Sequence, residues 1–361
     1  MKYAVKKIRL HSFKNFRELT YNLNSGHLFG RNSEGKTNLL SSICALVLNQ
    51  DMDGSRLLPL QEGVQSGWVD VEWIVDGKSV QTYREWRRTD SGFASTGTPP
   101  DFNRSEFLLI FNPRYVFEIS HGERRDLITD LVYGDSHGNI LDEIPEDIEP
   151  WVKKIAMEFG KINLLKMRSD IKKYRTELRV LAENKRKYEY QHEIVEDPDQ
   201  SYELSNNINE CNEEICRIQE YIDAIEIIEN CLLHNAIEYL NPKMIMTRFT
   251  PEGKITFNDW GMDRLSCGEM LECGLDIANM VAGISKSHIP PTVIDDATMY
   301  GMSNIDTELY NNLSQIITAS YADVDLCEYD NGCLVAVDQS WKVLVKEDFR
   351  MDVQIEMKPF Q

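Results

Sequence analysis

The sequence predicts an α/β fold in which both ends of the chain build one domain around a helical insert. Three observations support this prediction. Short strand-like runs alternate with helical patterns towards both ends, whereas the middle repeats apolar residues every three and four positions. Residues 30–37 hold two glycines and end in Lys-Thr, and residues 290–296 end in two aspartates, so polar groups that could form one site lie towards both ends of the chain. We therefore expect an N-terminal lobe at residues 1–145, a helical insert at 146–240 and a C-terminal lobe at 241–361.

The composition narrows the range of partners. The 361 residues suffice for one large domain or two modest ones, and 42% hydrophobic and 27% charged residues are ordinary for a globular protein. The formal net charge of −20 argues against a protein that coats nucleic acid through its overall charge. The cysteines show no zinc-binding spacing, and no apolar run is long enough for a signal sequence or a membrane span. We expect free thiols, a cytoplasmic protein and no contact with a membrane.

Several elements of the N-terminal lobe can be predicted from local patterns. Residues 2–10 alternate and predict a strand, and the Asp-Gly pair at residues 76–77, between two strand-like runs, predicts a β-hairpin. Residues 91–103 are rich in Gly, Ser, Thr and Pro and predict a surface loop. The run at 107–111 predicts a buried strand, and residues 121–127 predict a turn into a helix.

The pattern G-x-x-x-x-G-K-[ST] occupies residues 30–37, between a strand-like run and a helical run. A loop in this setting points backbone N–H groups and a helix N-terminus at a polyphosphate. Lys36 would then reach the β- and γ-phosphates, and the Thr37 hydroxyl would bind Mg²⁺. An ordinary glycine-rich turn also matches such a pattern by chance. The residues expected to bind nucleotide are Gly30, Arg31, Asn32, Ser33, Glu34, Gly35, Lys36, Thr37 and Asn38.

Two later stretches strengthen the nucleotide interpretation. Residues 265–269 read Leu-Ser-Cys-Gly-Glu and begin a predicted helix that continues to about residue 284. Residues 290–296 form a short β-branched run that ends in Asp295 and Asp296. A phosphate loop, an LSxGE signature and a strand that ends in carboxylates, in this order, are what an ABC-type ATPase head requires.

The insert carries two apolar seams at heptad spacing, separated by the turn-forming residues 196–199. The first seam is Leu164, Met167, Ile171, Tyr174, Leu178 and Leu181, and the second is Leu204, Ile208, Cys211, Ile215, Ile218, Ile222 and Ile225. They predict a short antiparallel coiled-coil hairpin with arms of roughly 40 Å. The first arm is rich in Lys and Arg, and the second in Glu and Asp. These charges can form salt bridges between the two arms, and the basic arm can lie along a phosphate backbone. Neither role excludes the other.

These motifs resemble the RecF and SMC branch of ABC-type ATPases, and RecF most closely. The resemblance spans most of the chain. It rests on residues 8–17, the loop GRNSEGKTNLL, Phe111-Asn112-Pro113 followed by residues 121–125, the signature LSCGE, the pair Asp295-Asp296 and residues 315–319. It implies an ATP-binding head that dimerises head to tail, so that the signature of one subunit closes over nucleotide held by the other.

The resemblance also implies a role for each motif. Thr37 and Asp295 would hold Mg²⁺, Lys36 would hold phosphate in the catalytic site, and Asp296 would act as the general base that orients water. The residues that would contact the γ-phosphate across the interface are Ser266, Gly268 and Glu269. An aspartate is shorter than the glutamate of SMC proteins and sits farther from the water, so we expect slow hydrolysis.

Three departures from the family pattern favour binding and dimerisation over fast turnover. Ser33 stands where a glycine is usual, residues 297–302 lack the acidic residue of the dimer-contact loop, and no histidine follows the strand ending at Thr318.

Three functional classes stay open. The first is an ATP-gated protein that binds DNA, expected to be double-stranded, in recombination or repair. The second is an ATPase sensor or scaffold in an antiviral or toxin-type system, where it controls a partner effector. The third is a nucleotide-binding protein without hydrolysis. The first two imply a further protein partner besides a second copy of the chain.

Overall fold

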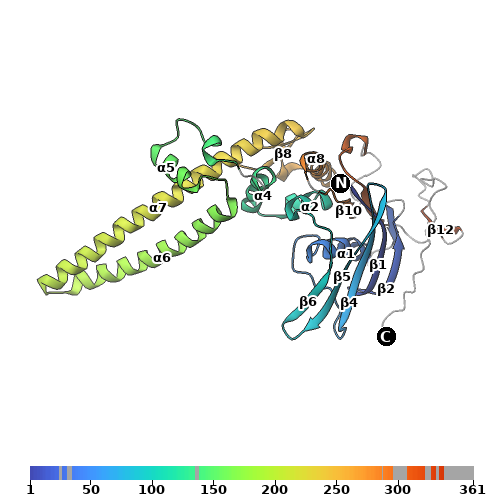
Figure 1. Cartoon of the computed structure of the whole chain (residues 1–361), viewed down its shortest axis with the longest axis horizontal. Helices are drawn as coiled ribbons and strands as arrows, with labels where there is room; N and C mark the ends of the chain where they lie inside the picture. The colour runs from blue at the N-terminus through green and yellow to red at the C-terminus, as the bar shows by residue number, and fades with distance from the viewer. Residues whose placement is uncertain are drawn as a thin grey trace. The chain divides into compact units, whose positions relative to one another are not determined.

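The computed structural model describes residues 1–23, 27–30, 35–134, 138–286, 288–295, 307–321, 327–330 and 333–336. They form two compact units (Figure 1). The first comprises residues 1–121 and 241–249 and continues from 254, and the second comprises 122–240 and 250–253. The sequence predicts the first boundary at residue 145 instead. Outside the described residues lie Arg31, Asn32, Ser33, Glu34, Asp296 and residues 297–302, for which the sequence predicts roles in the site.

An antiparallel sheet of five strands, in the order β2-β1-β4-β5-β6, makes up much of the first unit. Its strands are β1 (Tyr3–Phe13), β2 (Phe16–Asn22), β4 (Ser66–Val75), β5 (Lys78–Thr89) and β6 (Gly92–Thr98). The predicted hairpin is confirmed: Asp76 and Gly77 have φ of 47° and 79°, the left-handed values of a type I′ turn. Alternate residues of β4 are buried, and the Trp73 indole donates to Thr82 Oγ1 at 2.6 Å.

Strand β6 shows that the predicted surface loop at residues 91–103 is largely wrong. Its residues pair with β5 from Tyr83 opposite Thr98 to Thr89 opposite Gly92. Gly97 packs so closely on β5 that a Cβ there would lie 2.1 Å from the Tyr83 carbonyl oxygen. Small and polar residues are tolerated in this strand because most of it is exposed at the sheet edge. Local composition does not reveal such a pairing.

A second sheet is parallel and joins the two ends of the chain. Its order is β10 (Thr292–Ile294), β11 (Ile316–Tyr321) and β3 (His27–Gly30). Helix α1 (Lys36–Leu48) follows β3 and contacts β4. Because parallel strands share a direction, the carboxyl ends of β3 and β10 lie at one edge of the sheet. Residues 35–37 and Asp295 follow those ends.

The helices of the first unit correct a second prediction. Residues 107–111 belong to helix α2 (Arg104–Phe111), not to a strand, and are all buried. The Asn103 side chain begins this helix by accepting the backbone N–H groups of residues 105 and 106 at 3.0 and 3.1 Å. An apolar run buried on every side carries no periodicity that separates helix from strand. The short helix α3 (Tyr115–Glu118) follows.

Helix α8 (Cys267–Ile284) begins and ends as predicted. It packs against α2, and Gly274 lies against the segment that follows α2, since a Cβ there would lie 2.2 Å from the Pro113 carbonyl oxygen. The buried carboxylate of Asp276 accepts the backbone N–H groups of residues 245, 246 and 247 at 2.8 to 3.0 Å. These bonds fix the chain where it re-enters the first unit.

The remaining elements of the first unit are short. They are η2 (Asn241–Lys243), β7 (Thr247–Phe249), β8 (Ile255–Phe257), β9 (Trp260–Gly261), η3 (Met262–Arg264), η6 (Thr307–Tyr310), β12 (Cys327–Asp330) and β13 (Cys333–Ala336). In the described part of residues 303–314, only the 3₁₀ turn η6 is helical. Strand β13 pairs with β12 in an antiparallel hairpin.

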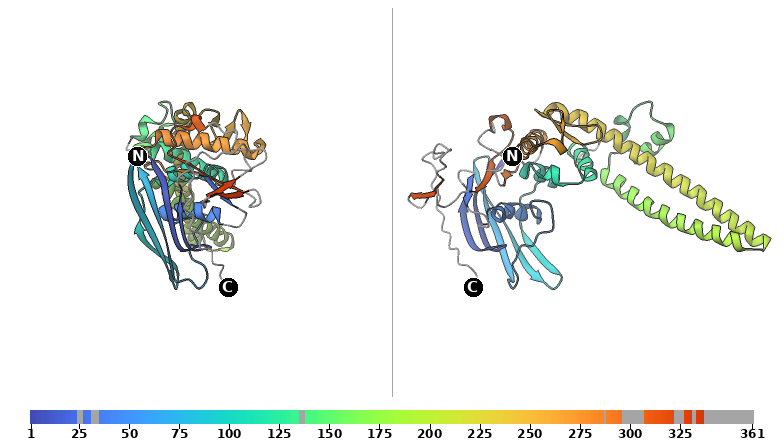
Figure 2. Two further views of the ribbon diagram at one scale, coloured as in Figure 1. Left: turned by 90° about the vertical axis from the view of Figure 1, so that its right-hand side faces the viewer. Right: turned by 180° about the vertical axis from the view of Figure 1, so that it is seen from behind.

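The second unit is helical. It contains most of α4 (His121–Tyr133) together with η1 (Ile140–Asp142), α5 (Pro150–Phe159), α6 (Leu164–Ile194) and α7 (Pro198–Leu240). Helices α6 and α7 run antiparallel along each other (Figure 2). Arg175 bonds to Glu226 at 2.6 Å, and the rings of Tyr174 and Tyr221 meet at 4.9 Å. At 31 and 43 residues, the helices are longer than the predicted arms.

Candidate nucleotide site

The phosphate-loop threonine and the carboxylate after β10 meet in the structure. The Thr37 hydroxyl donates to Asp295 Oδ2 at 2.6 Å. Thr37 lies in the first turn of α1 and is exposed, and Asp295 directly follows β10 and is half-buried. Two oxygen groups from opposite ends of the chain therefore converge at the carboxyl edge of the parallel sheet. Hard cations such as Mg²⁺ prefer oxygen ligands.

The turn between β1 and β2 packs against the start of α1. Gly35 has φ of 91°, and a Cβ there would lie 2.7 Å from both Asn15 Nδ2 and Phe16 Cζ. The Asn38 side chain donates to Asn15 Oδ1 at 2.8 Å. This packing explains why glycine occupies position 35, because a side chain there would add backbone strain in the left-handed region and would collide with its neighbours.

Lys14 ties the same turn to α1. Its Nζ lies 2.9 Å from Ser41 Oγ and 2.7 Å from Asp51 Oδ2, and the Ser41 hydroxyl also donates to Asp51. Burial acts to raise the pKa of Asp51, but the hydrogen bonds from Lys14 and Ser41 outweigh it and hold that pKa below its ordinary value. Residues 13–17 also belong to the motifs that resemble RecF, but that resemblance does not predict these contacts. No local spacing signals them.

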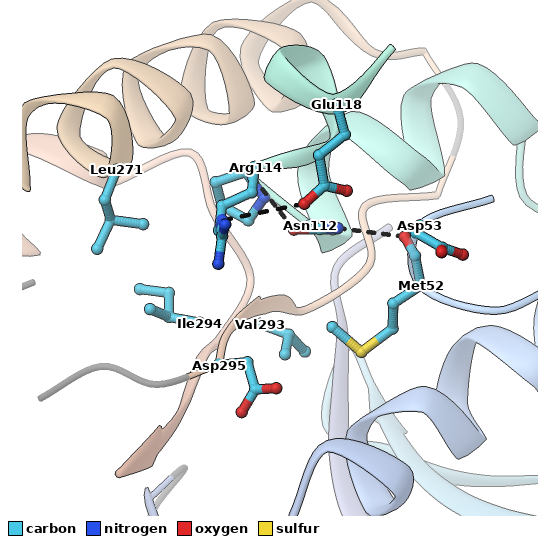
Figure 3. Close-up of a pocket in the computed structure, with 10 residues that line it drawn as sticks. Met52, Asp53, Asn112, Arg114, Glu118, Leu271, Val293, Ile294 and Asp295 are labelled. Carbon is cyan, nitrogen blue, oxygen red and sulfur yellow. Dashed lines mark hydrogen bonds and ion pairs between the residues drawn. The ribbon is translucent and has the colours of Figure 1, made fainter. Parts of the chain in front are cut away.

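A pocket opens beside Asp295 (Figure 3). Its volume is about 140 Å³, and its lining comes from the segment after α1, from residues 112–118, from α8 and from the end of β10. Asn112 bridges two of these segments, because its amide donates to the Met52 carbonyl at 3.2 Å and its Oδ1 accepts the Arg114 N–H at 3.1 Å. The Arg114 side chain lies 3.9 Å from Glu118. The Phe-Asn-Pro segment thus frames the pocket next to the candidate metal ligand.

The signature residues form the beginning of α8. Ser266 caps the helix: its hydroxyl accepts the Glu269 N–H at 3.3 Å and donates to Glu269 Oε2 at 2.7 Å, and its own N–H donates to the same oxygen at 2.8 Å. The backbone N–H and the hydroxyl of Ser266 hold the pKa of Glu269 below its ordinary value. Ser266 is exposed and Gly268 is half-exposed. This helix tip is therefore accessible, and α8 reaches the Asp295 pocket through Leu271.

The paired arginines at positions 124 and 125 lie in α4 of the second unit. Arg124 is 6% exposed, and burial lowers its pKa. Arg125 donates to the Asn230 side chain on α7. Arg125 thus links α4 to the long hairpin, while Arg124 is buried and presents little surface to a ligand.

Two features are absent from the described residues. No group of three or more His, Cys, Asp or Glu in that part of the chain is placed to hold a metal ion. No helix among the described elements is long and apolar enough to cross a membrane.

Solved structures to which this chain is similar include RecF and SMC head domains. The structure of "the recombination mediator protein RecF-ATP in RecFOR pathway" shares 12% identity over 97% of this chain and 94% of its own, with a TM-score of 0.43. The chain resembles RecF and SMC head domains. The Pyrococcus furiosus Smc head, bound to the C-terminal domain of ScpA, shares 16% identity over 89% of this chain and 90% of its own, with a TM-score of 0.41.

The SMC head domain from Thermotoga maritima shares 13% identity over 92% of this chain and 99% of its own, with a TM-score of 0.32. No protein-family model and no curated protein matches the sequence.

Proposed function

We propose that this chain binds ATP with Mg²⁺ and hydrolyses it slowly. The observation that carries the proposal is the 2.6 Å bond between Thr37 and Asp295, which brings the end of the phosphate-loop motif to the strand that ends in carboxylates. The parallel sheet alone brings both strand ends to one edge, and the direct bond between the two side chains is what favours one shared site. In this proposal the head is of the ABC type, and the long hairpin of α6 and α7 is its coiled coil.

The residues present fit this ligand. Gly35, within the phosphate-loop motif, has a left-handed conformation and caps the start of α1, whose N-terminus favours an anion. Lys36 supplies a positive charge for phosphate oxygens, and Thr37 and Asp295 supply oxygen ligands for Mg²⁺. Bound Mg²⁺ neutralises charge that develops on the phosphates during transfer. Asp296 is proposed as the base that orients the attacking water.

We further propose that ATP joins two copies head to tail. The accessible tip of α8 suits this role, because its Ser266 hydroxyl and the N–H groups of the first turn favour an anion held by a second copy. Without that anion, the hydroxyl of Ser266 is bonded to Glu269. Nucleotide binding would therefore exchange an intramolecular hydrogen bond for one across the interface.

The proposed setting is DNA recombination or repair, with double-stranded DNA and a further protein as partners. A sensor or scaffold that controls an effector is the competing role. Binding of duplex DNA by the purified chain over a salt series separates them, since phosphate contacts weaken steeply with salt. DNA affinity that appears only after a second protein is added would favour the scaffold.

The central experiment compares Lys36→Met with Lys78→Met, which removes an exposed lysine from the β4–β5 hairpin of the same unit. Loss of a hydrogen-bonding charge partner costs about 1.5–3 kcal/mol, so Lys36→Met should bind fluorescent ATP roughly 10- to 100-fold more weakly. It should also lose the ATP-induced dimer in gel filtration, and the control should keep both properties. An unchanged ATP-induced dimer in Lys36→Met refutes the proposal.

A further inference from the structure

Most basic residues of α6 lie on one side of the helix. The apolar seam defines heptad positions a and d, at residues 164, 167, 171, 174, 178 and 181, and burial along it falls towards the far end of the hairpin. Positions b and c then face away from α7. Six cations occupy them, which we call the outer stripe: Lys166, Lys172, Lys173, Arg179, Arg186 and Lys187. All six side chains are exposed.

Salt bridging between the two arms does not explain the outer stripe. The described ion pair that joins α6 to α7 uses Arg175, at position e, which contacts Glu226 at 2.6 Å. Two other basic residues of α6 are also paired: Arg168 with Asp130 at 2.9 Å and Lys185 with Glu189 at 3.6 Å. Within the described residues, none of the outer-stripe cations has a carboxylate partner.

Acidic residues are kept away from this stripe. Helix α6 carries acids at positions 170, 177, 183, 189 and 193, and of these only Glu193, beyond the last cation, falls at position b or c. Helix α7 carries the acidic arm, with Glu210, Glu213, Glu214, Glu220 and Asp223 among its residues. A polyanion is therefore attracted to one side of the hairpin and repelled from the other.

We propose that the outer stripe binds the phosphate backbone of double-stranded nucleic acid. Residues 166 to 187 span about 32 Å at 1.5 Å per residue, close to the roughly 34 Å of one duplex turn. Positions 172, 179 and 186 repeat every seven residues, so their cations recur about every 10 Å along one line. The proposal rests on the DNA role proposed above and adds its location. In a chain with a net charge of −20, such a surface must be local.

The test measures anisotropy of a labelled 20-base-pair duplex against the full chain at several salt concentrations. If all six cations contact phosphates, log affinity falls with log salt with a slope of about −5, and affinity drops roughly 10³-fold between 50 and 200 mM salt. The triple variant Lys172→Gln, Arg179→Gln, Arg186→Gln should reduce the slope by about 2.7, so that its affinity drops only roughly 40-fold over the same salt range.

The matched control is Lys154→Gln, Lys161→Gln, Arg217→Gln. It removes the same charge from exposed positions of the same unit but outside α6. We expect its salt slope to stay within one of the parent value. Equal losses in both triple variants would show a nonspecific effect of net charge and would overturn the proposal.

ATP binding separates failure of this inference from failure of the proposed function. The outer-stripe variant leaves the residues of the first unit unchanged, so it should bind fluorescent ATP like the parent. A parent that binds ATP but no duplex refutes the DNA role itself. A variant that binds duplex like the parent refutes only the outer stripe. If sedimentation instead shows that the stripe holds two copies together at low salt, the acidic α7 of a second copy is its partner and the nucleic-acid proposal is wrong.

Discussion

Replacing Gly35 with alanine tests whether the turn between β1 and β2 positions the nucleotide loop. At φ of 91° an alanine costs about 1–2 kcal/mol of backbone strain. Its Cβ would also lie 2.7 Å from Asn15 and Phe16, and such overpacking adds about 1–3 kcal/mol. The sum is a loss of roughly 2–5 kcal/mol in the free energy of unfolding of the first unit.

Gly77→Ala is the control for Gly35→Ala. Gly77 has φ of 79°, but nothing lies within 4 Å of the Cβ that it would acquire, so it reports the backbone strain alone. Urea unfolding gives the free energy of unfolding of each variant. Titration with fluorescent ATP gives the ATP affinity of the folded proteins. Gly35→Ala should be the less stable by about 1–3 kcal/mol and should bind ATP at least about tenfold more weakly. Equal stability with parental ATP affinity would refute the positioning argument.

Three further predictions follow from buried or crowded groups. Asp276→Ala leaves three backbone N–H groups without their acceptor, so urea unfolding should show a loss of about 3 kcal/mol, and a loss below about 1 would contradict that role. Gly274→Ala pushes a Cβ into the Pro113 carbonyl and should destabilise by about 1–3 kcal/mol, whereas Gly283→Ala meets only a movable amide and should cost less. Burial raises the pKa of Glu229, so this group's contribution to stability is fully present below the unfolded pKa near 4.5 and is lost as pH rises through the folded value. Glu229→Gln should therefore gain melting temperature relative to the parent as pH increases, and a constant difference would contradict this.

The elements that could be predicted from sequence are those specified by local chemistry. Helix α8 was predicted to its ends from the signature and the segment that follows it, and the structure shows the local reason: Ser266 and Glu269 form a capping box. The β4–β5 hairpin was predicted because an Asp-Gly turn separates two alternating runs. Neither inference needed a distant contact.

The elements that were missed lack a local signal of their own. Strand β6 exists because β5 offers an edge, and α2 was missed because its run is buried on every side and carries no periodicity that separates helix from strand. The same distinction applies to the candidate site. Family resemblance, rather than spacing, placed Thr37 and Asp295 together, and the supporting bonds from Asn15 and Lys14 join residues that no sequence pattern connects.

The pairing of β3 with β11 also bears on how the protein is made. The strand that leads into the phosphate loop emerges early from the ribosome, yet its described neighbour in the parallel sheet emerges almost a whole chain length later. Long-range pairing of this kind folds slowly and leaves strand edges exposed meanwhile. Nascent chains that stop before residue 316 should therefore lack ATP affinity, and chaperones would have their longest opportunity to act during that interval.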